Sequence, residues 1–253
     1  MLNTVITGDA SDRPPLVIAH GLFGSARNWG VLARRLGTDR QVIAVDMRNH
    51  GQSPRFRTNG YAEMADDLAD VIAAHGGRAD VLGHSMGGKA AMVLALGRPE
   101  LVARLIVADI APVGYGHSQT PLIRAMKGLD LDAVTTRRDA DAALEQAIPE
   151  PPVRAFLLQS LDLKGERPRW LINLDVLEAE TDAIIGFPDV AGRFDGPALF
   201  LAGGASDYVQ AAHEDRIRAL FPAAKLEWIE GAGHWLHAEK PREFEAEIRA
   251  FLD

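Results

Sequence analysis

The sequence predicts an α/β fold, in which a mostly parallel central sheet is flanked by helices and carries an inserted helical cap. Three observations predict it: short apolar, β-branched runs recur along the chain, helical patterns separate them, and one long interval lacks such runs. Because the runs are apolar on both faces, they are typical of parallel strands that helices cover on both sides. At 253 residues and 47% hydrophobic, the chain can bury a large core.

Six strands are expected, and turn signals follow each of them. The runs are LVIAHG (16–21), QVIAVD (41–46), ADVLGHS (79–85), RLIVADI (104–110), ALFLAGG (198–204) and KLEWIEG (225–231). Helical patterns are expected at about 26–36, 61–75, 86–97, 211–220 and 241–252. Pro241 stands at the first position of the last helix, where proline is well tolerated.

Residues 112–196 interrupt this alternation. The interval has no convincing strand but contains helical segments such as DADAALEQAI (139–148) and PVRAFLLQSL (152–161). Since the runs before and after it belong to one sheet, it is expected to be a helical cap inserted into the core. The core would then comprise residues 1–111 and 197–253.

Composition excludes several classes of function. The formal charge of -8 is spread along the chain without a basic block, so neither nucleic acid nor an anionic membrane is an expected partner. The first residues, MLNTVITGDASDRPP, lack the pattern of a signal peptide, and no apolar run reaches 18 residues, so a cytoplasmic location is expected. Without cysteine, any nucleophile is oxygen rather than sulfur. The oligomeric state is not predicted.

Ser85 is the candidate nucleophile. It lies in Gly83-His84-Ser85-Met86-Gly87, where a predicted strand turns into a predicted helix, which is the setting that a nucleophile elbow requires. Glycines on either side of the serine allow the sharp turn, and the amide of Met86 at the start of the helix is a candidate oxyanion donor. The alternative is a glycine-rich turn in which the serine has no catalytic role.

A serine hydroxyl needs a base, and eight histidines compete for that role. His234 is preferred because it lies in the loop after the last strand, where the third member of a Ser, acid, His order is expected. His237, three residues further on, is the weaker candidate. The second oxyanion donor is expected in the loop His20-Gly21-Leu22-Phe23-Gly24, with the amide of Leu22 preferred and that of Phe23 as the alternative.

Five motifs resemble the α/β-hydrolase superfamily, and most closely its YbfF-type esterases. They are HGLFGSARNW, DMRNHGQSP, GHSMGGKAAM, ADIAPVGY and GAGHWLHAEKP. The resemblance extends over nearly the whole chain and implies a cap over the carboxyl edge of the sheet. It also implies hydrolysis of small-molecule carboxylic esters or acyl thioesters. The expected chemistry is that of a serine hydrolase with no metal and no organic cofactor.

Two aspartates compete to be the acid that orients His234. Asp207 lies after the predicted strand 198–204, where most relatives carry the acid, but an alignment of this turn puts Ser206 in that position. Asp109 instead ends an apolar run 24 residues after Ser85, where a carboxylate is costly unless it is paired. The resemblance to YbfF-type esterases carries the acid onto Asp109, with Ser206 as a hydrogen-bonding helper.

Other polar and aromatic residues are expected around the site. Arg48, Asn49 and His50 are expected to form a polar network that fixes the loop beside the oxyanion turn. Lys89 is expected to be solvated or paired in a salt bridge. Three residues are candidates for lining the substrate pocket, and they are Trp170, Asn173 and Tyr208.

The leading hypothesis is an esterase or thioesterase that works through an acyl-enzyme. A cofactor-free C–C hydrolase or a perhydrolase would keep the same three residues, and a slow ligand receptor on the same fold would be a different class of protein. Haloalkane dehalogenases and epoxide hydrolases are disfavoured, because they need a carboxylate where this chain has Ser85.

Overall fold

Seven strands form one sheet in a computed structural model that describes residues 1–253. The strand order is β1-β3-β2-β4-β5-β8-β9; β1 pairs antiparallel with β3, and all other neighbours are parallel. The strands are β1 (Thr4–Thr7), β2 (Leu16–Ala19), β3 (Val42–Val45), β4 (Ala79–His84), β5 (Val102–Ala108), β8 (Ala198–Gly203) and β9 (Ala224–Ile229). The predicted fold class and its six strands are confirmed.

β1 was not among the expected strands. This strand has four residues and lies at the edge of the sheet, and its Val5 and Ile6 are 44% and 48% exposed. A run of four residues with exposed apolar side chains is too short to stand out from a loop in the sequence.

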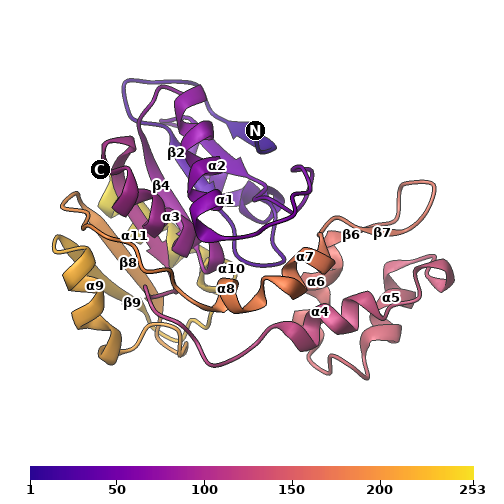
Figure 1. Cartoon of the computed structure of the whole chain (residues 1–253). Helices are drawn as coiled ribbons and strands as arrows, with labels where there is room; N and C mark the ends of the chain where they lie inside the picture. Colours follow the sequence, from indigo (N-terminus) through magenta and orange to yellow (C-terminus); the bar gives the residue numbers. More distant parts are fainter.

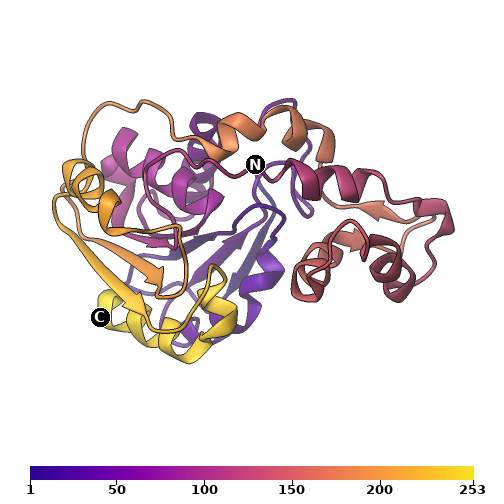
Figure 2. The ribbon, with the colours of Figure 1, turned by 90° about the horizontal axis from the view of Figure 1, so that it is seen from below.

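Helices cover both faces of the sheet. Alternate residues of a strand point to opposite faces, so Val17 packs in the cluster that contains α2 and α3, whereas Ile18 packs with α1 and α11. Figure 2 shows α11, in yellow, on the opposite side of the strands from α3, in magenta. These helices and the short 3-10 turns of the core are η1 (Ala26–Trp29), α1 (Gly30–Leu36), α2 (Tyr61–Ala74), α3 (Met86–Gly97), η2 (Pro99–Leu101), η5 (Ala211–His213), α9 (Glu214–Leu220), α10 (Leu236–Glu239) and α11 (Pro241–Leu252).

The chain between β5 and β8 extends away from the sheet (Figure 1). Its elements are α4 (Thr120–Lys127), η3 (Leu131–Ala133), α5 (Arg137–Leu144), α6 (Pro151–Leu157), η4 (Leu158–Ser160), β6 (Leu161–Asp162), β7 (Arg169–Trp170), α7 (Leu174–Ala179) and α8 (Thr181–Ile185). The expectation of no strand here is corrected, because β6 and β7 form an antiparallel pair. Strands of two residues are too short to leave a periodic pattern. We refer to residues 112–196 as the cap; its boundaries stay a prediction.

The parallel strands end at one edge of the sheet, and this edge positions the candidate site. Ser85 directly follows β4, Asp109 directly follows β5, and His234 lies in the loop after β9. Loops at the carboxyl ends of parallel strands are where ligands bind in open α/β sheets. No helix in the structure has the length and apolar character needed to cross a membrane.

Candidate active site

Ser85 occupies a strained turn between β4 and α3. Its φ is 53° and its ψ is -119°, a conformation that residues with a side chain rarely adopt. The turn is tight, because a Cβ added to Gly83 would lie 2.2 Å from the carbonyl oxygen of Gly87, and one added to Gly87 would lie 2.4 Å from that of Ala19. The two glycines therefore let the chain present the Ser85 side chain at the edge of the sheet.

Three side chains expected to work together form a continuous chain of hydrogen bonds. Ser85 Oγ lies 3.1 Å from His234 Nε2, and His234 Nδ1 lies 2.7 Å from Asp109 Oδ2. Asp109 is fully buried. A carboxylate can only accept, so Nδ1 carries the proton and Nε2 is left to accept the Ser85 hydroxyl proton.

The structure brings Asp109, and not Asp207, to His234. Asp109 adopts a φ of 49° at the end of β5, and its Oδ1 accepts a hydrogen bond of 2.8 Å from the amide of Gly203. Its Oδ2 also accepts a 2.5 Å hydrogen bond from Ser206 Oγ, the contact expected of a helper. Asp207 is exposed, and only its backbone carbonyl makes a hydrogen bond, with Gln210.

The two candidate amides of the oxyanion loop differ in their hydrogen bonds. The Phe23 amide donates to His50 Nε2 at 3.3 Å, whereas the Leu22 amide has no hydrogen-bond partner within the protein. The loop lies against Ser85, because a Cβ added to Gly21 would be 3.1 Å from Ser85 Cβ. Leu22 therefore has the free amide, and Met86 at the first position of α3 is the other candidate donor.

Two buried histidines support this loop. His50 Nδ1 donates to the carbonyl of Arg48 at 2.8 Å, which leaves Nε2 as an acceptor. His20 Nδ1 likewise bonds the carbonyl of Gly21, and its Nε2 accepts the amide of Met47 at 2.9 Å. Burial lowers the pKa of His50 to about 3, so its ring stays neutral and keeps the acceptor. Arg48 Nε donates to Asp67 at 2.6 Å and Asn49 Oδ1 accepts from the amide of Phe56 at 2.8 Å, so the polar network expected beside the candidate oxyanion turn is present.

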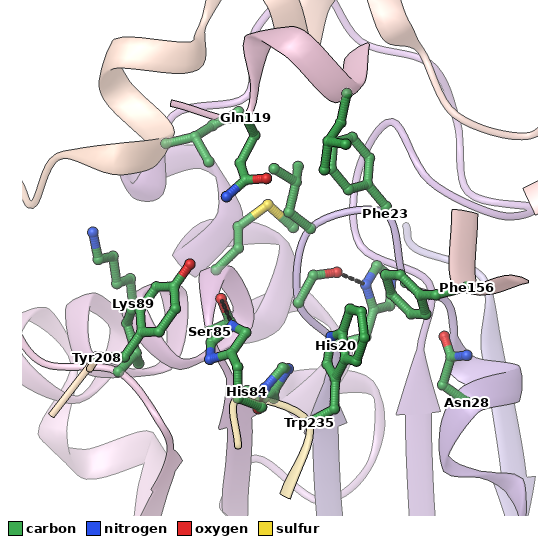
Figure 3. Close-up of a pocket in the computed structure, with 18 of the residues that line it drawn as sticks. His20, Phe23, Asn28, His84, Ser85, Lys89, Gln119, Phe156, Tyr208 and Trp235 are labelled. Carbon is green, nitrogen blue, oxygen red and sulfur yellow. Dashed lines mark hydrogen bonds between the residues drawn. The ribbon is translucent and has the colours of Figure 1, made fainter. Parts of the chain in front are cut away.

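A cavity of about 440 Å³ opens onto Ser85 and His234. Figure 3 shows Ser85 in this cavity, with Tyr208 and Lys89 on one side and Phe156, Trp235 and Asn28 on the other. Most of its wall is apolar, from both the core and the cap, and includes Leu22, Phe23, Ile110, Leu122, Phe156 and Trp235. Such a wall suits a hydrocarbon chain next to Ser85.

Comparison with known proteins identifies the family of this chain. Residues 16–247 match the sequence profile described as the Alpha/beta hydrolase family. The chain belongs to this family. It is 42% identical to the sn-1-specific diacylglycerol lipase ABHD11 of Mus musculus, over 98% of this chain and 83% of the mouse protein. It is also 42% identical to Esterase YbfF of Escherichia coli (strain K12), over 94% of this chain and 93% of that protein.

A solved structure of a marine microorganism esterase is similar throughout. It superposes with a TM-score of 0.94 at 38% identity, and the match covers 99% of this chain and 98% of that one. The resemblance to YbfF-type esterases that the motifs indicated is therefore confirmed.

Two residues expected to line the pocket of this hydrolase lie elsewhere. Trp170 is 7% exposed, and its indole Nε1 donates to the carbonyl of Met126 at 2.9 Å within the cap. Asn173 Nδ2 donates to Asn49 Oδ1 at 3.1 Å and to the carbonyl of Phe56 at 3.2 Å, which joins the cap to the loop after β3. Neither residue lines the cavity, whereas Tyr208 does. The two expectations are corrected, because both side chains are engaged in packing the cap.

Lys89 was expected to be solvated or salt-bridged, and it is neither. It is 1% exposed, and its Nζ donates to the carbonyls of Ile185 at 2.8 Å and Gly186 at 2.5 Å, where the cap returns to the core. Burial lowers its pKa to about 7. The position of Lys89 in an otherwise apolar helix, one turn after Ser85, could have indicated that its side chain is buried.

Acid is expected to destabilise this hydrolase. Burial lowers the pKa of His50 to about 3 and that of His237 to about 4, from an ordinary 6.5. Burial also lowers the pKa of His20 and His84. Between pH 6.5 and 5 the unfolded chain binds protons that the folded chain does not, so the free energy of unfolding falls as pH falls. Once such a histidine is fully protonated in the unfolded chain, it lowers the free energy of unfolding by about 1.4 kcal/mol for each pH unit that the pH falls.

Urea unfolding between pH 5 and 6.5 measures that slope. The His237→Gln variant should show a slope smaller by up to about one proton, because it removes one buried neutral ring. A His237→Gln slope equal to that of the wild type would contradict the expectation.

Proposed function

We propose that the chain is a serine hydrolase that cleaves carboxylic ester or acyl thioester bonds through an acyl-enzyme on Ser85. It is a carboxylic ester hydrolase, in keeping with relatives named esterase and lipase. One observation carries the proposal for the mechanism: hydrogen bonds link buried Asp109 to His234 and His234 to Ser85, and Ser85 faces a cavity with a largely apolar wall.

Acylation begins with Ser85 and His234. Ser85 Oγ attacks the carbonyl carbon of the ester while His234 Nε2 takes its proton, and His234 then returns the proton to the leaving alcohol or thiol. The acyl group remains on Ser85. Water attacks this acyl-enzyme with His234 again as the base, which releases the acid and restores the hydroxyl.

The oxyanion and the imidazolium that form in this reaction both lie next to groups that could stabilise them. The amides of Leu22 and Met86 would donate to the oxyanion of each tetrahedral intermediate. Asp109 would hold the imidazolium of His234, and the hydrogen bonds from Gly203 and Ser206 fix the position of this buried carboxylate. No step requires a metal or an organic cofactor.

A panel of substrates tests this function and measures the length of acyl chain that the cavity accepts. We expect p-nitrophenyl esters, and the corresponding coenzyme A thioesters, to be hydrolysed with kcat/KM rising about fourfold for each buried methylene, until the apolar wall is filled. Longer chains should then gain nothing further. The Ser85→Ala variant is the control for background hydrolysis. If the wild type turned over no member of the panel faster than this variant, the proposal would fail.

A further inference from the structure

The aromatic ring of Tyr208 packs flat against His234. The two ring centroids are 3.9 Å apart, and the ring planes differ by 18°. Tyr208 comes from the loop after β8, and it lines the cavity beside Ser85 (Figure 3). The hydrogen bonds to Ser85 and Asp109 hold two edges of the imidazole, and this ring contact holds one of its faces.

The core and the cap together fix the position of Tyr208. Its hydroxyl lies 2.6 Å from Nε2 of His117, near the start of the cap. Its carbonyl accepts a 2.6 Å hydrogen bond from the hydroxyl of Tyr115, and its amide donates to Ser206 Oγ at 3.3 Å. Ser206 also donates to Asp109, so the loop that carries Tyr208 is tied to the carboxylate of the site.

In the proposed reaction, the contact with Tyr208 is stronger when His234 is charged than when it is neutral. The imidazole is neutral at rest and becomes a cation each time it takes a proton from Ser85 or from water. The face of an aromatic ring carries negative potential and attracts a cation more strongly than a neutral ring. An interaction that is stronger in the charged state lowers the barrier to both proton transfers.

We propose that Tyr208 is a positioning residue for His234, whose aromatic ring holds the imidazole against Ser85 and stabilises the imidazolium that forms during turnover. The inference rests on the proposed function of Ser85 and His234. It assigns the effect to the ring of Tyr208 and not to its hydroxyl.

Two substitutions separate the ring from the hydroxyl. Tyr208→Leu keeps an apolar side chain but removes the aromatic face, so kcat should fall by about 3- to 30-fold while KM changes less than about twofold. Tyr208→Phe keeps the face and loses only the bond to His117, so it should retain at least about half of the wild-type kcat. Tyr208→Met, which also fills space without a ring, repeats the test should the Leu variant fold poorly. Thermal unfolding checks that each variant is folded.

Inactivation by a small methyl fluorophosphonate provides a readout that does not depend on binding of an acyl chain. It requires His234 to activate Ser85, so the rate constant for inactivation should fall with Leu in about the same ratio as kcat, and recover with Phe. Three outcomes would overturn the inference: equal losses with Phe and Leu, a rise in KM with kcat unchanged, or an unchanged rate constant for inactivation. An inactive wild type that does not react with the fluorophosphonate would instead reject the proposed function.

Discussion

Replacing Ser85 by Ala is expected to lower kcat for ester hydrolysis by about 10⁴- to 10⁶-fold, because the variant lacks the oxygen that receives the acyl group. The fold should be retained. Ala is smaller than Ser and differs only by the hydroxyl, whose one hydrogen-bond partner in the structure is His234. Steady-state assays with a p-nitrophenyl ester measure the loss, and thermal unfolding serves as the control for folding. A variant with activity within tenfold of the wild type would show that Ser85 is not the nucleophile.

The acid provides the second large effect, and Asp207 provides its matched control. Asp109→Asn should lower kcat by about 10³- to 10⁴-fold, because an amide in place of the carboxylate neither stabilises the imidazolium nor enforces the Nδ1–H tautomer of His234. Asp207→Asn removes the same charge from an exposed side chain in the loop after β8, and should change kcat by less than about tenfold.

Assays of both Asn variants with one substrate compare the two positions directly. Asp109 is buried and accepts three hydrogen bonds, so its variant also needs a check of folding by thermal unfolding. A crippled Asp207→Asn variant beside an active Asp109→Asn variant would place the acid after β8 and overturn the assignment.

The sequence predicted most of the core because local patterns determine it. The buried strands are continuous apolar runs, and the glycines around Ser85 mark a turn that tolerates no side chain. β1 was not predicted, because its two exposed apolar residues resemble those of a loop. The pattern of hydrophobic residues thus sufficed for six strands of the sheet, including β9 at its other edge, and failed for the short strand β1.

The choice between Asp109 and Asp207 could not be made from the residues alone. Both follow strands of the sheet, and a carboxylate at either place could in principle approach His234. The backbone decides, because a φ of 49° at the end of β5 places Asp109 next to Gly203 and Ser206 of the neighbouring strand end. A conformation of this kind leaves no signature in a non-glycine residue.

The predictions for Asn173 and Lys89 were wrong for a related reason. Asn173 binds Asn49, 124 residues away along the chain, and Lys89 Nζ binds carbonyls 96 and 97 residues further on. Local periodicity contains no information on such contacts. The role of a polar residue in the cap therefore emerges only when the two parts of the chain are placed against each other.

Covalent labelling tests the central claim most directly. Wild-type protein incubated with a fluorophosphonate should gain the mass of one phosphonyl group, and peptide mapping by mass spectrometry should place that group on Ser85. The Ser85→Ala variant should gain none under the same conditions. Equal labelling of both proteins, or a single adduct at another residue of the wild type, would contradict a mechanism in which His234 activates Ser85 for attack.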